Sequence, residues 1–185
     1  MNIVSELHQD HVNLDRLLEI LERKVTRLRA GNHPDFSLMA EVVDYVGDYA
    51  DQHHHPREDR MYAFFRGRDA ALDKAFDKSE AEHVTLKQLS TRLAESIDGI
   101  LHDAVMPMDQ FTDQLEAFVK AEKAHLRHEE KAIFKPLESL ASDTDWQALA
   151  EQLPQSEDPL FGERQADQYR ALYKALVEDM KSSDS

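Results

Sequence analysis

One stretch decides how the rest of this chain is interpreted: His53-His54-His55-Pro56-Arg57-Glu58-Asp59. Residues four apart share one face of an α-helix, so His54 and Glu58 would point the same way. A helix with this spacing offers one nitrogen and one oxygen ligand to a metal ion. The pattern returns at His125 and Glu129, and both copies run into apolar residues. Together the two copies predict a metal held between antiparallel helices.

The composition bounds the class of protein. The 185 residues fit one domain with a substantial core, and the 5 glycines and 6 prolines leave long helical segments, so we expect an all-α protein. The absence of cysteine excludes disulfides, iron–sulfur clusters and thiolate metal sites.

The net charge of −15 argues against nucleic acid and anionic membrane surfaces as partners. No apolar run approaches the roughly 20 residues of a membrane helix. Since the N-terminus also lacks the features of a signal peptide, we expect a soluble cytoplasmic protein.

Four long segments have apolar residues at spacings of three and four, which predicts four helices that face a bundle core. They cover about 3–30, 37–66, 70–101 and 107–140, with a separate short helix at 70–76 as an option in the third. Pro56 lies inside the second segment. A proline there removes one backbone hydrogen bond and clashes with the carbonyl four residues back. We therefore expect a kink near Gln52, or a helix that restarts close to the histidines.

Each predicted helix carries one histidine in its apolar stripe: His11, His54, His83 and His125. A single core histidine is usually a hydrogen-bonded structural residue, but four of them with two inward glutamates are not explained in this way. Nitrogen and carboxylate ligands without sulfur suit zinc, manganese or non-haem iron. Six protein ligands are too many for a closed tetrahedral zinc site. They suit two metal ions that share bridging carboxylates.

Other polar side chains lie near this set. Glu122 is a charge at a core-facing position, with the i, i+3 spacing to a histidine that occurs in di-iron carboxylate bundles. Either rotation of the helix exposes Glu122, or it serves the metal site. His53 and His55 are expected to point away from the His54 face and to be exposed, with a role as an additional ligand or as a residue that supports the ligands as the alternative for His55. His8 lies toward the edge of its stripe and is expected to be solvated or supporting.

The segment 142–185 differs in character from the rest. Thr144 is predicted to open a short helix through a capping box with Gln147, and a last helix is predicted over about 163–180. We divide the chain into a metal-binding bundle at 1–141 and a C-terminal helical extension at 142–185 packed on it. A homodimer surface is the alternative role of the last helix.

These features together resemble the hemerythrin-like, or HHE cation-binding, proteins over about Leu7 to Leu140. The residues that carry the resemblance are His11, His54-x-x-x-Glu58 with Asp59, His83 after Glu82, and His125-x-x-x-Glu129-Glu130 with Phe134. The stretch Asp158-Pro159-Leu160-Phe161-Gly162 is also similar to a tail segment of many bacterial members. The resemblance implies an up-and-down four-helix bundle around a non-haem di-iron centre. In that centre Glu58 and Glu129 correspond to the bridging carboxylates, and the four stripe histidines to terminal ligands.

One position departs from the pattern of the family's oxygen carriers, whose third helix supplies two histidines four apart. Here Lys87 follows His83 at that spacing. The resemblance therefore leaves one ligand missing or replaced, with Glu122, Glu80, His8 or water as candidates. Reversible oxygen carriage needs every position but one to be filled by protein. The departure thus favours peroxide turnover, nitric oxide capture, iron sensing or iron exchange over bulk oxygen carriage.

We therefore expect a protein with two iron ions that binds, senses or consumes a small oxidant or gas (O2, peroxide or nitric oxide). Zinc and manganese are less expected, and turnover and sensing are equally open. The alternative is a non-catalytic iron- or zinc-binding regulatory module for iron homeostasis. Such a module would act through a protein partner that contacts its acidic surface and terminal helix.

Overall fold

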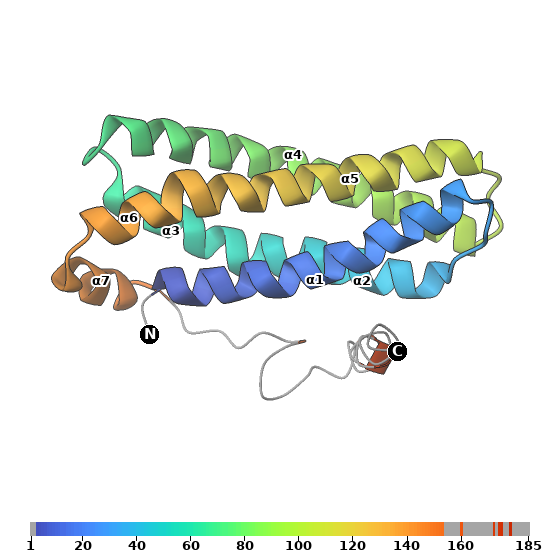
Figure 1. Ribbon diagram of the computed structural model, residues 1–185, viewed down its shortest axis with the longest axis horizontal. Coiled ribbons are helices and arrows are strands. Elements are labelled where there is room, and N and C mark those ends of the chain that lie inside the picture. The colour runs from blue at the N-terminus through green and yellow to red at the C-terminus, as the bar shows by residue number, and fades with distance from the viewer. Residues whose placement is uncertain (1–2, 154–159, 161–171, 173, 176–177, 179–185) are drawn as a thin grey trace.

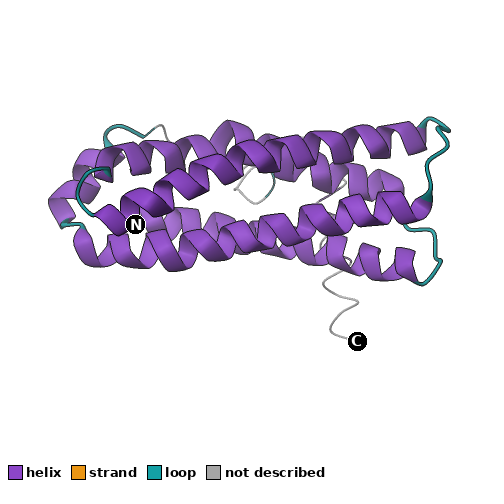
Figure 2. Cartoon of the chain, turned by 90° about the horizontal axis from the view of Figure 1, so that it is seen from above, coloured by secondary structure: helices purple, strands orange, loops and turns teal. Residues whose placement is uncertain are grey.

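The computed structural model describes residues 3–153, 160, 172, 174–175 and 178, and this part of the chain contains helices and no strand. Four antiparallel rods lie side by side and are joined by short loops at the two ends of the bundle (Figures 1 and 2). The expected all-α, up-and-down four-helix bundle is thus confirmed. No described helix combines the length and apolar character that a membrane span requires.

Helices α1 and α4 are single, uninterrupted rods, and the other two rods are each built of three pieces. Helix α1 covers Ile3–Arg29, and the second rod consists of α2 (Phe36–Tyr49), η1 (Ala50–His54) and α3 (His55–Phe65). Helix α4 covers Ala70–Leu101 without a break, so the optional separate helix at 70–76 is wrong. The fourth rod consists of α5 (Met108–Glu129), η2 (Glu130–Phe134) and α6 (Lys135–Leu140), and a short helix α7 (Asp143–Ala150) follows.

Side-chain caps fix where several helices begin. Asp35 accepts a hydrogen bond from the backbone of Leu38 at the start of α2, and Asp69 caps α4 in the same way. At α7 the capping box joins Ser142 and Asp145, so the box that we expected to begin at Thr144 is placed wrongly. Ser142 has the extended backbone that an N-cap needs, while Thr144 already lies inside the helix.

Two π-helical turns interrupt the second and fourth rods. In η1 the backbone N–H of His55 bonds to the carbonyl of Ala50, and in η2 the N–H of Lys135 bonds to the carbonyl of Glu130. A proline follows each turn, at Pro56 and Pro136. The i→i+5 turn is wider than an α-turn, so it can take up the clash and the lost hydrogen bond that a proline causes inside a helix. The irregularity that we expected near Gln52 is therefore a π turn.

Two apolar clusters fill the bundle, one on each side of a polar layer. The cluster at the α1–α2 loop end includes Leu14, Leu18, Leu21, Met39, Val43, Val46, Leu93, Ile97, Phe111, Leu115 and Phe118. The cluster at the other end includes Val4, Leu7, Met61, Tyr62, Phe65, Leu72, Phe76, Ile133, Phe134, Leu137 and Leu149. All four rods pass from one cluster to the other, and at the crossing point each rod carries a buried histidine. The polar layer is therefore enclosed by apolar side chains at both ends.

The C-terminal extension is described only in part. Helix α7 packs Leu149 into the second cluster, and Leu160 and Leu172 are fully buried in the first. The helix that we predict over 163–180 and the stretch Asp158–Gly162 fall almost entirely outside the described residues. The proposed division of the chain at 141/142 therefore stays a prediction.

Candidate metal centre

The polar layer brings together all six residues that the sequence pattern singles out as metal ligands. They come from every rod of the bundle and are buried: His11, His54, Glu58, His83, His125 and Glu129. Both glutamates are completely inaccessible to solvent, which is rare for a carboxylate unless it is paired with a cation.

The candidate ligands form two groups, and Glu58 belongs to both. The first group consists of His11, His54, Glu58 and Glu129, and the second consists of His55, Glu58, His83 and His125. Within each group one nitrogen or oxygen atom of every residue lies within 4.8 Å of the others. Each group is therefore compact enough for one metal ion to be bound by all of its members.

Both glutamates extend between the two groups. Glu58 Oε1 lies 3.1 Å from His54 Nε2 and 3.3 Å from His11 Nε2, while its Oε2 lies 3.4 Å from His83 Nε2. Glu129 does the same with the opposite oxygens: Oε2 lies 3.3 Å from His11 Nε2, and Oε1 lies 3.3 Å from the Nε2 atoms of His83 and His125. Each carboxylate thus presents one oxygen to each group, as a carboxylate shared by two ions must.

Several of these inward atoms have no hydrogen-bond partner. Both oxygens of Glu58, Oε2 of Glu129 and Nε2 of His125 are buried and unpartnered. A buried charged or polar atom without a partner costs free energy, and one cation in each ligand group would together satisfy all four atoms. The donor set of imidazole nitrogens and carboxylate oxygens suits zinc, iron or manganese. The residues present therefore fit a metal site.

His55 is the largest correction to the sequence-based expectation. We expected it to point away from the other ligands, but it is only 6% exposed, and its ring stacks on that of His83 with centroids 3.9 Å apart. The reason is the π turn η1, which ends at His54. A π turn holds more residues than an α-turn, so the side chains that follow it point in a different direction around the helix axis than α-helical spacing predicts. His54 and His55 consequently enter different ligand groups, although they are neighbours in sequence. His53 is half-buried beside Tyr49 and belongs to neither group.

With His55 included, five histidines and two glutamates surround the centre. The position that we expected to be missing or replaced on α4 is matched by His55, which enters a candidate ligand group from the second rod. Lys87, which occupies the expected position on α4, is 66% exposed and lies 3.4 Å from Asp51. The argument against oxygen carriage that depended on a missing histidine loses its premise.

The other candidates for the replacement ligand lie outside both groups. Glu80 pairs with Arg66 at 2.9 Å on the surface, and His8 is exposed and lies 2.8 Å from Glu130. Glu122 is buried, but it lies one turn before His125 and enters neither group. Burial raises the pKa of Glu122 to about 7, against the opposing effect of the nearby histidines.

A carboxylate approaches the outer nitrogen of each candidate histidine. The Nδ1 atoms lie 2.8 to 3.1 Å from these partners in four cases: His11 and Glu130, His54 and Asp10, His83 and Asp59, and His125 and Glu82. In the fifth, His55 Nδ1 lies 3.7 Å from Asp51. Such a partner fixes the tautomer and the ring orientation, so that the other nitrogen can bind a metal.

The sequence reasoning did not single out Asp10 or Asp51 as partners of the candidate histidines. Asp51 had a local signal, since it precedes His55 by four residues and so shares its helix face. Asp10 had none, because it reaches His54 from another rod.

The two glutamates differ in their surroundings. Tyr62 donates a hydrogen bond of 2.6 Å from its hydroxyl to Glu129 Oε1, and Ser79 donates a second one to the same oxygen. Glu58 receives no hydroxyl donor in the described part of the structure. Burial, together with the negative charges of Glu58 and Glu129, raises the pKa of Tyr62 well above its usual value, so the phenol keeps its proton.

Electrostatics favours positive charge at the centre. Burial lowers the pKa of His54, but Glu58 and Asp10 outweigh this effect and raise it to about 9. In the same way, Asp59, Glu129 and Glu58 outweigh the burial of His83 and raise its pKa to about 12. Without a metal the imidazoles would therefore hold protons that offset the carboxylate charges, and a bound metal would replace those protons.

Comparison with known protein families agrees with this geometry. The chain matches the family model described as Hemerythrin HHE cation binding domain over residues 2–137. A search of curated proteins finds no match. The match covers three rods completely, the fourth as far as residue 137, and every residue of both ligand groups, so the chain belongs to the hemerythrin HHE cation-binding family.

Proposed function

We propose that this protein holds two iron ions in its polar layer and binds a small oxidant or gas there. The observation that carries the proposal is the placement of Glu58 and Glu129, each of which turns one oxygen to each histidine group. Two carboxylates that each face both histidine groups suit two metal ions that share them. Iron is favoured because sulfur-free nitrogen and oxygen ligands in a two-metal carboxylate bundle are typical of di-iron proteins.

The two groups differ in the number of ligands that they offer. With both glutamates counted for each group, the histidines His55, His83 and His125 give one ion five protein ligands. His11 and His54 give the other ion four. A small molecule would therefore bind on the side of His11 and His54, where the protein leaves more positions open. Oxygen, peroxide and nitric oxide are all small enough to be candidates.

Bound iron would supply the electrons, or the open coordination position, that such a ligand needs. The surrounding residues orient the site and keep it dry. Phe134 stacks on His11 with ring centroids 4.9 Å apart and closes the centre toward the second apolar cluster. Tyr62 and Ser79 keep two hydroxyl protons at Glu129 Oε1, which fixes that carboxylate in place.

Metal analysis of the purified protein tests this proposal. Iron content and the near-ultraviolet and visible spectrum would be measured for the wild type, for Glu58→Ala and for Glu138→Ala, which changes an exposed glutamate on α6. We expect two irons per chain in the wild type and in Glu138→Ala, and no two-iron site in Glu58→Ala. Two irons in Glu58→Ala would show that this carboxylate is not a bridge.

Addition of an oxidant to the loaded protein then separates binding from turnover. Consumption of many equivalents of peroxide per site would indicate an enzyme, and a stoichiometric spectral change would indicate a carrier or sensor. A colourless wild-type protein with one zinc ion would overturn the di-iron proposal and favour a regulatory metal-binding module.

A further inference from the structure

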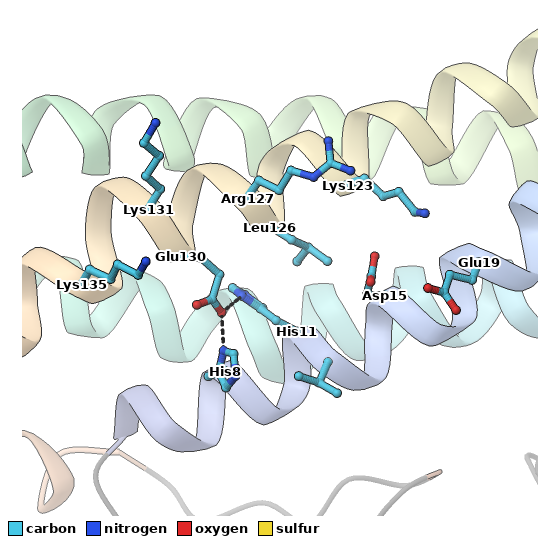
Figure 3. Close-up of a pocket in the computed structure, with 11 residues that line it drawn as sticks. His8, His11, Asp15, Glu19, Lys123, Leu126, Arg127, Glu130, Lys131 and Lys135 are labelled. Atoms are coloured by element: carbon cyan, nitrogen blue, oxygen red, sulfur yellow. Dashed lines mark hydrogen bonds and ion pairs between the residues drawn. The ribbon is translucent and has the colours of Figure 1, made fainter.

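A groove of about 770 Å³ lies outside the metal centre, between α1 and the fourth rod (Figure 3). Val12 and Leu126 contribute apolar side chains to its lining, which also includes His11. Unlike the polar layer, the groove is open to solvent. Nothing in the proposed di-iron function accounts for its shape or its charge.

The fourth rod contributes a row of four basic residues to this groove, namely Lys123, Arg127, Lys131 and Lys135. They follow one another at intervals of four. In a regular α-helix a turn holds 3.6 residues, so side chains spaced four apart lie slightly more than one turn apart. Such a row therefore moves gradually around the helix axis. The π turn η2 (Glu130–Phe134) has a wider turn and so reduces the drift between Arg127 and Lys135. The interruption of the helix thus keeps the basic residues along one groove.

Most of this positive charge is uncommitted. Lys123 pairs with Glu22 at 2.7 Å, but Arg127, Lys131 and Lys135 form no ion pair with another described residue. Figure 3 shows Lys135 reaching toward Glu130, Arg127 extending along the fourth rod toward Lys123, and Lys131 pointing away from α1. The chain as a whole has a net charge of −15, so three unpaired cations in one groove run against its overall charge.

The acidic residues of the groove do not neutralise this end. Asp15 and Glu19 lie on α1 near Lys123, at the opposite end from Lys135 (Figure 3). Glu130 is nearer, but its carboxylate is already shared by His8 and His11, each at 2.8 Å. The end formed by His8, Lys131 and Lys135 can therefore accept further negative charge.

We propose that this groove binds a small multivalent oxyanion, carried by a phosphate ester or a dicarboxylate, through Arg127, Lys131 and Lys135. Arginine forms paired hydrogen bonds with phosphate or carboxylate, and lysine adds mobile positive charge. The volume of the groove leaves room for the organic part of such a ligand over Val12 and Leu126. Arg127, Lys131 and Lys135 belong to neither ligand group, so the proposed anion site is distinct from the metal centre, although His11 borders both.

Calorimetric titration of the full-length, metal-loaded protein tests the proposal, with inorganic phosphate and succinate as probes at constant ionic strength. The test variant is the double substitution Lys131→Ala and Lys135→Ala. The matched control is Lys74→Ala with Arg92→Ala, which removes the same charge from exposed positions on α4. We expect saturable binding to the wild type and the control, weakened at least about tenfold in the test variant because two charged contacts are lost.

The probe that binds more tightly identifies the source of the oxyanion as a phosphate ester or a carboxylate. The proposal is overturned if neither probe binds saturably, or if both double variants weaken binding equally, since only the overall charge would then matter. It is also overturned if binding persists unchanged in the test variant, because the anion would then lie on the metal ions instead of in the groove.

Discussion

The second rod and α4 pack against each other across the metal centre, yet they supply it in different ways. Helix α4 runs without interruption and contributes one histidine, His83. The second rod contains a π turn and a proline, and it contributes His54, His55 and Glu58. In a regular helix, neighbouring residues diverge by about 100° around the axis, so consecutive histidines rarely serve one site. The comparison shows how an irregular turn can increase the number of ligands that one helix provides.

The largest expected effect comes from removal of the extra ligand on the irregular rod. His55→Ala leaves its group with two histidines, so we expect loss of one of the two bound ions. Lys87→Ala, at the position on α4 where the family's oxygen carriers have a histidine, should keep both ions because Lys87 points to solvent. Metal content after dialysis against a weak chelator measures the difference. Equal metal loss in both variants would remove His55 from the ligand set.

A transfer of the ligand between the rods sharpens this comparison. His55→Ala combined with Lys87→His places a histidine one turn after His83, on a regular helix where residues four apart share a face. We expect the double variant to recover part of the second ion that His55→Ala loses, together with its near-ultraviolet absorption. A double variant no better than His55→Ala would mean that only the second rod can place the fifth imidazole.

The same comparison explains what the sequence could predict. The regular stretches were predictable, because stripes of apolar residues at spacings of three and four define helices and their inner faces. His11, His83 and His125 interrupt such stripes, and the structure places all three in the polar layer. Pro56 also indicated where regularity would fail.

The orientation of His55 was not predictable from this pattern. A spacing argument assumes 3.6 residues per turn, and the π turn η1 violates that assumption directly before His55. The supporting carboxylate Asp10 was missed for a different reason. It lies on α1 and reaches His54 on another rod, and no local pattern records a contact between residues 44 positions apart.

The second rod and α4 should also differ in how pH affects the stability of the metal-free protein. The pKa of His54 is raised from 6.5 to about 9, and that of His83 to about 12. A raised pKa means that the folded state binds more protons than the unfolded state above pH 6.5. The stabilisation is therefore complete below pH 6.5 and is lost as pH rises through the folded-state value. We expect the urea midpoint of the metal-free protein to fall as pH increases from 6.5.

Two variants separate the contributions of the rods. In His54→Gln the fall in the urea midpoint should be shallower up to pH 9 and unchanged above it. In His83→Gln it should be shallower on both sides of pH 9, because the pKa of His83 is higher. Metal-loaded protein should not show this fall, since metal ions replace the protons. A midpoint that rises with pH in the metal-free protein would contradict the assignment of protons to these imidazoles.

The smallest expected effect concerns the carboxylates behind the two stacked histidines. Asp59 lies 3.1 Å from Nδ1 of His83 on α4, whereas Asp51 lies 3.7 Å from Nδ1 of His55 and also contacts Lys87. A carboxylate that holds a ligating histidine typically contributes a factor of about ten to a hundred in metal affinity. Asp59→Asn should therefore weaken metal binding about tenfold, at the lower end of that range because Asp59 is half exposed. Asp51→Asn should weaken it less, because 3.7 Å is too long for a full hydrogen bond.

Competition with a chelator measures metal affinity in both variants, with Asp48→Asn, an exposed change on α2, as the control. If Asp51→Asn proves the more damaging of the two, the Asp51 contact shortens when metal binds, and the irregular rod would then tighten around its ligand while α4 stays fixed.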